Sequence, residues 1–213
     1  MIITVGNQKG GCGKTTLAVN LACLYAQKGT TLLIDADTQQ SSMLFREARP
    51  DTAAHFSAVA NHTATIHEDV KTFTHNTIII DAGGRDNKPF RSSVIASDLL
   101  IIPVTPSPVD LWSAEDTFRL YQEIKMIKNI KGLIVLNMVQ PGVNITGDVI
   151  DILKEYSEKY QLKVLDSMIS FRTAFKESFA EGLSVAEMKG EKFKKAAEET
   201  INFFNEVNHV FKG

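Results

Sequence analysis

The segment 9–16, KGGCGKTT, constrains the fold of this chain more than any other feature. It follows the short apolar run Ile2–Val5 and precedes leucines at helical spacing. A glycine-rich turn between a strand and a helix is a phosphate cradle, because its backbone N–H groups point inward and the helix N-terminus carries partial positive charge. The sequence therefore predicts an α/β fold that binds the phosphates of a nucleotide in this turn.

Each residue of this loop has an expected role. The glycines let the backbone approach the phosphates, and the backbone N–H of Cys12 faces them. Lys14 is expected to reach the β- and γ-phosphates, and the Thr15 hydroxyl is expected to bind Mg²⁺. The loop residues expected to contact the nucleotide are Lys9, Gly10, Gly11, Cys12, Gly13, Lys14, Thr15 and Thr16.

The loop also departs from the common phosphate-binding motif. Gln8 stands where that motif has a glycine, five positions before Gly13. The loop carries an additional cation, Lys9, beside its first two glycines. A second cation in a phosphate loop suggests a nucleotide that is handled by two subunits.

Composition narrows the class of protein. The chain has 213 residues, 44% of them hydrophobic and 23% charged, which fits one α/β domain spanning 1–213. A net charge of −2 argues against a surface coated in positive charge but leaves room for a local basic patch. There is no long apolar run and no signal-peptide pattern, and the two cysteines lack metal-ligand spacing, so a reduced cytoplasm is expected.

Strand and helix patterns alternate along the chain, which predicts a doubly wound, mostly parallel twisted sheet with helices on both faces. The predicted strands are Ile2–Val5, Thr31–Ile34, Thr77–Ile80, Leu99–Val104, Gly132–Asn137 and Leu162–Leu165. The predicted helices are Thr15–Lys28, Ser41–Ala48, Ile66–Phe73, Phe90–Ala96, Ser113–Ile127, Thr146–Lys159, Thr173–Glu181 and Glu191–Val210. The segment Arg49–Thr65 is predicted as a loop with one edge strand from Ala53 to Ala58.

Acidic residues follow two of these strands, where a parallel sheet binds ligands. Asp37 could position or deprotonate an attacking water, or the run DAD could be a helix-capping turn before Ser41. For Asp35 the capping role is favoured. Asp81 ends the buried run TIII and is followed by two glycines, the Walker B pattern, so it is expected to hold Mg²⁺ through a water.

Two further features leave alternatives open. The strand exit within 99–116 holds Pro103, Pro106 and Pro108, and it is either a rigid loop or a surface on which a partner subunit docks. Asn137 ends another strand, where its carboxamide could contact an adenine edge or simply form a turn. Spacing alone favours the turn.

Together these motifs resemble the ParA/MinD superfamily of deviant Walker A ATPases. KGGCGKTT, DADTQQS and IIIDAGG are similar to its three signatures, and IIPVTPSPVDLWSAED resembles the small ParF-type plasmid-partition branch, with VirC1-type conjugation proteins as cousins. Two departures stand out. Thr38 replaces a proline usual in the second motif, and Arg85 is a charged residue after the Walker B glycines with no assigned role.

The resemblance implies a weak Mg²⁺-dependent ATPase that binds ATP and ADP and dimerises on ATP. Lys9, Lys14 and Asp37 would be catalytic, with Lys9 reaching the phosphates of the other subunit. Thr15, Asp37 and Asp81 would form the metal site, and Asn137 would bind adenine. The dimer would bind DNA without sequence preference, associate with the nucleoid and be stimulated by a centromere-binding, ParB- or ParG-like partner.

Non-specific DNA binding needs basic side chains on one face. The candidates are Arg172, Lys176, Lys189, Lys192, Lys194 and Lys195. The alternative for the lysines near residue 190 is a solvated helix face, since 189–213 holds five lysines and four glutamates. A dimer would double a shallow patch into a usable one.

Three other functions remain as alternatives: a MinD-like membrane-associated ATPase, a VirC1-like conjugation ATPase and a metabolic enzyme. The C-terminal segment has apolar residues at helical spacing, but its polar side carries glutamates rather than cations, so packing on the domain is expected instead of membrane association. A metabolic role lacks a supporting motif, because the two cysteines are wrongly placed for a cluster shared between subunits.

Overall fold

A computed structural model of the protein describes residues 1–85 and 87–212. Its centre is a seven-stranded sheet with the strand order β3-β2-β4-β1-β5-β6-β7, and every pair is parallel. The strands are β1 (Ile2–Val5), β2 (Thr31–Asp35), β3 (Ser57–Ala60), β4 (Thr77–Asp81), β5 (Leu99–Val104), β6 (Lys131–Val139) and β7 (Lys163–Ser170). The predicted fold class is therefore confirmed.

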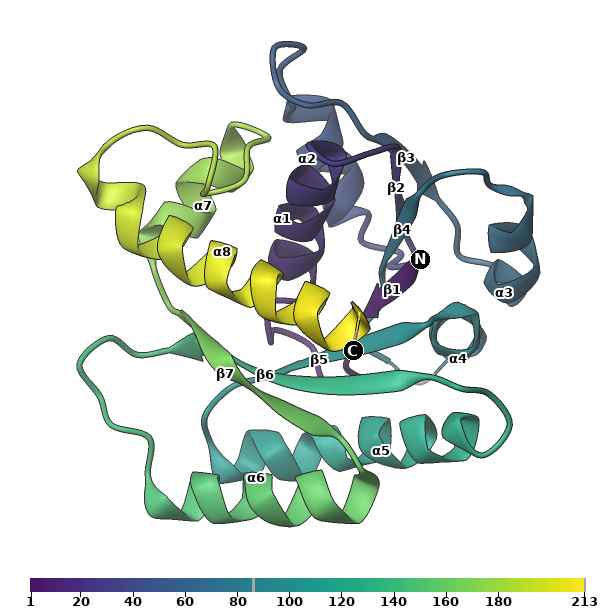
Figure 1. Ribbon diagram of the computed structural model, residues 1–213, viewed down its shortest axis with the longest axis vertical. Helices are drawn as coiled ribbons and strands as arrows, with labels where there is room; N and C mark the ends of the chain where they lie inside the picture. Colours follow the sequence, from purple (N-terminus) through teal and green to yellow (C-terminus); the bar gives the residue numbers. More distant parts are fainter. Residues whose placement is uncertain (86, 213) are drawn as a thin grey trace.

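Helices cover both faces of this sheet (Figure 1). They are α1 (Lys14–Ala26), α2 (Ser41–Ala48), α3 (Ile66–Asp69) with a 3₁₀ turn at Val70–Thr72, α4 (Lys88–Ala96), α5 (Pro108–Lys125), α6 (Gly147–Tyr160), α7 (Thr173–Ala180) and α8 (Glu191–Lys212). One face carries α1, α2, α7 and α8, and the other carries α3 to α6.

The two faces are separated by alternation within the strands. In β1, Ile3 and Val5 point into the core under α1 and α8, whereas the Thr4 hydroxyl lies on the opposite face and donates to the Ser93 carbonyl of α4 at 3.0 Å. β2, β4 and β5 are fully buried, and β1 is buried except at Ile2, because helices cover both sides of these strands. The near-continuous apolar runs in the sequence follow from this arrangement.

The central strand fixes the position of the ligand site. β1 lies between β4 and β5: the chain builds β2 and β3 toward one edge of the sheet, and it later builds β5, β6 and β7 toward the other edge. In open α/β sheets, ligands bind at such a switch point, beyond the carboxyl ends of the strands. The registers Val5↔Asp81 and Asp35↔Asp81 place the ends of β1, β2 and β4 side by side, so the phosphate loop and both acidic motifs share one edge.

Several helix and strand boundaries in the structure differ from the predicted ones. The edge strand was predicted from Ala53 to Ala58 but lies at Ser57–Ala60, where it pairs with β2. Helix α5 begins at Pro108, five residues before the predicted start, because proline is compatible with the first helical turn. β7 runs on to Ser170, past the predicted end at Leu165, because its exposed side carries polar residues that mask the strand pattern.

Helix α8 uses its apolar side within the protein. Phe203, Phe204 and Val207 are buried in the core beneath it, as the sequence analysis expects. Within residues 1–85 and 87–212, no helix is long and apolar enough to cross a membrane.

Candidate nucleotide site

The phosphate loop has a backbone that only glycine readily adopts at two positions. Gly11 has φ +77° and Gly13 has φ +83°, both in the left-handed region. Gly13 is also the N-cap of α1, so the first N–H groups of that helix face the loop. A Cβ at Gly13 would lie only 2.2 Å from Asn137 Nδ2, so a side chain at this position would displace the Asn137 amide.

Asn137 at the end of β6 closes one side of the loop. Its Nδ2 donates to the Cys12 carbonyl at 2.7 Å, and the side chain is almost fully buried. Asn137 also lines a pocket of about 270 Å³ together with Thr16, Ile169, Phe171, Phe175 and Phe179. An apolar pocket with an amide at its edge, next to the phosphate loop, suits a nucleotide base.

The two loop lysines are held differently. Lys14 is buried, and its Nζ donates to the Lys9 carbonyl at 2.9 Å across the loop. The Lys9 side chain lies at the rim of the loop with 31% of its surface exposed, and its Nζ forms an ion pair with Asp110 of α5. One cation therefore faces into the loop, and the other is directed toward the neighbouring helix.

Asp35 has the capping role that the sequence favours. Its Oδ2 accepts hydrogen bonds from the backbone N–H groups of Ser42 and Met43, in the first turn of α2, at 3.0 and 3.2 Å. Its Oδ1 accepts from the Asp37 N–H at 3.1 Å. Asp35 thus fixes the turn that carries Asp37, because an N-terminal helix turn has N–H groups without intrahelical partners.

Asp37 faces the Walker B segment. A Cβ built at Gly83 would lie 3.5 Å from Asp37 Cγ, and one built at Gly84 would lie 3.1 Å from Lys14 Nζ. The two glycines therefore pass between the second acidic motif and the phosphate loop. The absence of side chains lets the three segments approach each other closely, which is the arrangement that the sequence predicts.

Asp81 carries the most perturbed carboxyl of the site. Both of its oxygens are buried, and neither has a hydrogen-bond partner among the described residues. Burial and the negative charge of Asp35 raise the pKa of Asp81 to about 7, and the nearby Thr15 hydroxyl and Lys14 ammonium offset this only in part. A buried carboxylate without a partner destabilises the folded protein unless a cation binds it.

This carboxylate fits a hydrated cation. The expected Mg²⁺ ligands are Thr15, Asp37 and Asp81, and oxygen donors of this kind are what Mg²⁺ prefers. A cation beside Asp81 would supply the compensation that the protein itself lacks. The assignment of these three residues as the metal site stays a prediction, as do the other site residues.

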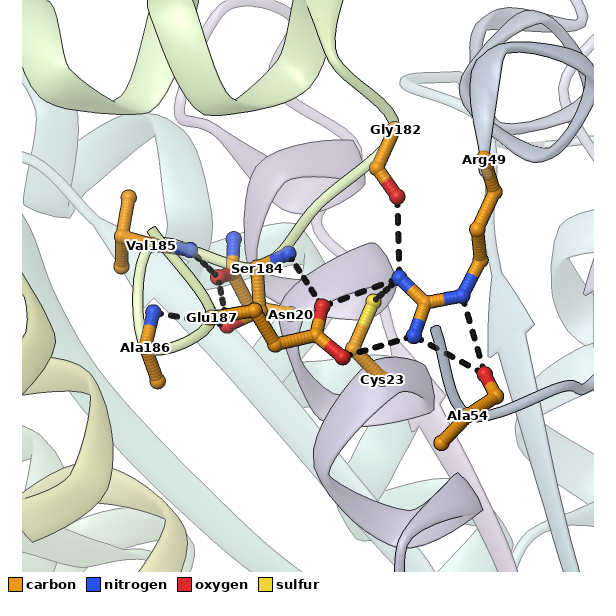
Figure 2. Close-up of polar contacts among 9 residues, drawn as sticks. All are labelled: Asn20, Cys23, Arg49, Ala54, Gly182, Ser184, Val185, Ala186 and Glu187. Atoms are coloured by element: carbon orange, nitrogen blue, oxygen red, sulfur yellow. Dashed lines mark hydrogen bonds and ion pairs between the residues drawn. The ribbon is translucent and has the colours of Figure 1, made fainter. Parts of the chain in front are cut away.

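A buried polar network supports the helix behind the loop. Asn20 of α1 donates from Nδ2 to the Thr16 carbonyl at 2.7 Å, and its Oδ1 accepts from the Ser184 hydroxyl at 2.7 Å. The nearby Glu187 pairs with the Arg49 guanidinium at 2.7 Å, as Figure 2 shows. Thr16 is thereby linked through Asn20 to the α7–α8 connection, and Glu187 ties that connection to the end of α2.

Arg49 is the hub of this network. Its side chain is 2% exposed. It donates to the carbonyls of Ala54 and Gly182 at 2.9 Å and to Cys23 Sγ at 3.0 Å (Figure 2). The charge of a buried guanidinium needs such complete pairing. Sequence analysis missed Arg49, because its partners other than Ala54 lie 26 to 138 residues away along the chain.

The candidate DNA contacts are only partly available. Arg172 forms an ion pair with Glu199 at 2.7 Å, Lys192 pairs with Glu177, and Lys194 lies 3.7 Å from Glu191. Lys176 lies over the Phe171 ring and lines the pocket beside the loop. Among the described residues, Lys189 and Lys195 are exposed and form no ion pair. The DNA contacts remain a prediction.

Comparisons with known proteins agree with this geometry. Residues 3–185 match the CobQ/CobB/MinD/ParA nucleotide binding domain. The chain is 28% identical to the maintenance of carboxysome distribution protein A of Halothiobacillus neapolitanus, covering 96% of this chain and 95% of that protein. It is 24% identical to a Rhizobium radiobacter protein ParA, covering 92% and 90%.

A solved structure shares the whole fold. The structure of Cyanothece McdA without nucleotide superposes with a TM-score of 0.79 at 17% identity, covering 100% of this chain and 99% of that one. The family match spans the phosphate loop, both acidic motifs and the Asn137 strand. The chain therefore belongs to the CobQ/CobB/MinD/ParA nucleotide-binding family, and it is an ATPase of the ParA/MinD type.

Proposed function

We propose that this ATPase is a positioning switch: ATP brings two copies face to face, the dimer binds DNA without sequence preference, and a partner protein stimulates hydrolysis. The observation that carries the proposal is the position of Lys9. Its side chain sits at the open rim of the phosphate loop instead of inside it, whereas Lys14 already occupies the inner side. A cation at the rim is suited to the phosphates of a facing subunit.

The neighbouring surface supports a face-to-face contact. Val109 and Trp112, on the first turns of α5 beside Lys9, are 60% and 57% exposed. Exposed aromatic and aliphatic residues beside a charged rim are typical of a protein interface. The occupant proposed here is a second copy of the chain, since a cation offered by one subunit needs the phosphates of the other.

Hydrolysis on this site needs positioning and charge stabilisation more than covalent chemistry. Lys14 would hold the β- and γ-phosphates, and Lys9 of the facing subunit would stabilise charge that develops on the γ-phosphoryl group. Asp37 would orient the attacking water, held by the Asp35-capped turn. Mg²⁺, when bound near Thr15 and Asp81, would neutralise phosphate charge.

The cargo has two candidates. The sequence favours DNA, such as a plasmid or chromosome, brought by a centromere-binding partner. A second candidate is a protein compartment, because the Halothiobacillus relative that matches 96% of the chain is named for carboxysome distribution. Both would use the same switch and differ only in the adaptor protein.

DNA binding in three nucleotide states tests the switch. We expect the wild-type protein to retard non-specific DNA in a gel-shift assay with ATP and to retard it weakly with ADP or without nucleotide. Lys14→Ala should abolish ATP-dependent retardation, and Lys71→Ala, on an exposed lysine far from the loop, is the matched control. Equal binding in all three states contradicts the proposal.

Lys9→Ala tests the dimer separately. We expect this variant to bind a slowly hydrolysed ATP analogue with near wild-type affinity and to remain monomeric in size-exclusion chromatography. Normal dimerisation of this variant contradicts the role given to Lys9. Sedimentation with ATP and anionic liposomes tests the MinD-like alternative, which the burial of the apolar side of α8 disfavours.

A further inference from the structure

We propose that Arg49 is a positioning residue for the base of the nucleotide: it holds the end of α7, the helix that forms one wall of the pocket beside the phosphate loop. The inference rests on the proposed function in one respect, since it takes this pocket as the site of the base of ATP. It goes further by assigning part of the nucleotide affinity to a residue that does not itself line the pocket.

Helix α7 supplies the aromatic wall of this pocket. Phe175 and Phe179, one helical turn apart, line the space of about 270 Å³ together with Thr16 in the first turn of α1 and Asn137 near the end of β6. Aromatic rings beside an amide offer a base both a packing surface and hydrogen bonds. The position of α7 relative to Thr16 therefore sets how well the pocket fits a base.

Packing alone gives α7 little hold. The buried members of its eight residues are Ala174 and Ser178, and Phe175 and Phe179 are only partly buried against the core. The Phe179 ring lies 5.2 Å from the Phe45 ring of α2, between ring centroids. Both buried side chains are small, so their burial contributes little free energy to fixing the helix. Polar contacts at its two ends are correspondingly important.

Arg49, at the end of α2, holds the C-terminal end of α7. Its Nη1 donates to the carbonyl of Gly182, two residues after the helix ends at Ala180, at 2.9 Å (Figure 2). The same guanidinium pairs with Glu187, whose Oε2 accepts the Ser184 N–H at 2.8 Å. Arg49 thus binds the segment after α7 directly at Gly182 and indirectly at Ser184, and a buried, fully paired guanidinium is a rigid anchor.

Gly182 brings the two backbones into direct contact. Its φ is +62°, and a Cβ built there would lie 2.3 Å from the backbone nitrogen of Arg49. There is no space for a side chain between the end of α2 and the segment after α7. A displacement at this contact therefore moves the end of α7, because nothing between them can absorb it.

The same segment also holds the Thr16 side of the pocket. The Ser184 hydroxyl and the Val185 N–H both donate to Asn20 Oδ1, at 2.7 and 3.1 Å, and Asn20 Nδ2 donates to the Thr16 carbonyl. Thr16 and α7 are therefore both positioned against one connection. Arg49 fixes this connection from the side of α2.

The N-terminal end of α7 is held independently. Arg172, the N-cap of α7, pairs with Glu199 of α8 at 2.7 Å, and Glu199 also accepts the Ser170 N–H at 3.0 Å. This end follows β7 directly and stays attached to the sheet. Loss of Arg49 should therefore leave the first turn of α7 in place and release the last turn, which carries Phe179.

The test compares the affinities for ADP and for inorganic pyrophosphate, both measured by calorimetry with Mg²⁺. Under the proposed function ADP leaves the protein monomeric, so dimerisation does not enter the measured affinity. Pyrophosphate lacks the ribose and the base, so it reports on the phosphate loop alone. A residue that only stabilises the fold would change the folded fraction and leave the ratio of the two affinities unchanged.

Arg49→Lys is the first variant. Lysine keeps a charge opposite Glu187 but lacks the planar fork that binds the Gly182 and Ala54 carbonyls at once. We expect the affinity for ADP to fall about 5- to 20-fold, because binding would have to order the aromatic wall, and the affinity for pyrophosphate to stay within about 2-fold of wild type.

A second variant covers the case in which Arg49→Lys does not fold. Arg49→Met combined with Glu187→Met replaces the whole ion pair, since apolar residues of similar volume can substitute for a buried pair without loss of stability. This double variant also removes the donor to the Gly182 carbonyl. We expect it to show the same selective loss of ADP affinity.

Two glycines of the α7–α8 connection form a matched pair. Gly182→Ala should push the end of α7 away from α2 without touching the ion pair, and should lower the affinity for ADP alone. Gly190→Ala is the control: its φ of +115° is also unfavourable for alanine, but among the described residues the added Cβ would meet only Phe193, at 3.9 Å. This control should bind both ligands as wild type does.

Phe175→Ala distinguishes the inference from the assignment of the pocket. If Phe175→Ala binds ADP as wild type does, the pocket is not the base site and that part of the proposed function fails. If Phe175→Ala loses ADP affinity but Arg49→Lys and Gly182→Ala keep the wild-type ratio, the inference about Arg49 fails and the pocket assignment stands. Selective loss of ADP affinity in all three variants supports both.

Discussion

Asn137 holds the phosphate loop from the opposite strand: its Nδ2 donates to the Cys12 carbonyl at 2.7 Å, across 125 residues of chain. The same side chain forms one wall of the pocket beside Thr16. A single amide therefore shapes the loop and contacts the space where a base would lie. The loop conformation and base binding should respond together to its removal.

Replacing Asn137 by alanine should weaken ATP binding at least 10-fold. The change leaves the Cys12 carbonyl without its side-chain donor, and an unpaired buried polar group costs about 1–3 kcal/mol. Titration with a fluorescent ATP analogue measures the affinity. Asn144→Ala, at an exposed position after β6, is the control and should bind as wild type. Equal affinities for the two variants contradict the role of Asn137.

Gly13→Ala and Gly142→Ala form a matched pair. Both positions have positive φ, +83° and +78°, so both variants pay a similar backbone strain of about 1 kcal/mol. Only at Gly13 does the added Cβ collide with Asn137, since nothing lies within 4 Å of a Cβ at Gly142. We expect loss of nucleotide binding for Gly13→Ala and normal binding for Gly142→Ala, measured by calorimetry.

Asp81→Asn should stabilise the nucleotide-free protein at neutral pH. The pKa of Asp81 is raised from 3.8 to about 7, mainly by burial. Because the folded form binds the proton more tightly, the wild type loses stability as pH rises from about 4 to about 7. Asp81→Asn lacks this loss. Its free energy of unfolding relative to wild type should therefore rise by about 2–3 kcal/mol between about pH 5 and pH 8, at about 1.4 kcal/mol per pKa unit.

Urea unfolding at the two pH values measures this effect. The same variant should lose the additional stabilisation that Mg²⁺ gives to the ATP-bound wild type, because the carboxylate is gone. Asp151→Asn, on an exposed position of α6, should show neither change. An Asp81→Asn protein less stable than wild type at pH 8 would overturn the assignment of Asp81 as an uncompensated carboxylate.

Glu187→Gln should destabilise the fold near pH 7 and reduce its acid sensitivity. Burial opposes ionisation of Glu187, but hydrogen bonds from Arg49 and the Ser184 N–H outweigh it and lower its pKa. A lowered carboxyl pKa gives stability above the unfolded value of about 4.5, and this stability is lost as pH falls through the folded value. Glu187→Gln lacks this pH-dependent contribution to stability.

We expect Glu187→Gln to lose about 3 kcal/mol near pH 7, because it leaves the buried Arg49 charge without its counterion. Thermal unfolding between pH 3 and pH 7 gives the profile. Glu198→Gln, on the exposed side of α8, serves as the comparison and should track the wild type. A Glu187→Gln profile parallel to wild type across this range contradicts the ion pair's contribution.

The sequence alone determined the architecture and the chemistry of the loop. Buried parallel strands need apolar residues on both sides, so β1, β2, β4, β5 and β6 appear as continuous apolar runs. Phosphate binding needs glycines and a lysine next to one another, so the loop is readable from neighbouring residues. Both signals lie in neighbouring residues, so they can be recognised in the sequence without knowledge of the tertiary structure.

Tertiary structure decided what depends on distant partners. β3 has exposed residues and exists because β2 offers it a pairing edge, so its boundaries were not visible in its own sequence. Arg172 is a predicted DNA contact, and the fold pairs its guanidinium with Glu199, 27 residues away, which the sequence does not indicate. Nothing in the local sequence around Asp110 indicates its partner, because Lys9 lies at the exit of another strand.

The physical reason is the same for each. The sequence around a charged residue is the same whether its side chain is solvated or forms an ion pair, because only the folded chain brings the partner next to it. The loop KGGCGKTT indicates phosphate binding by its own residues. The position of the Lys9 side chain, in contrast, depends on its ion pair with Asp110 of α5. The sequence determines which chemical groups the site has, and the tertiary structure determines where each group is held.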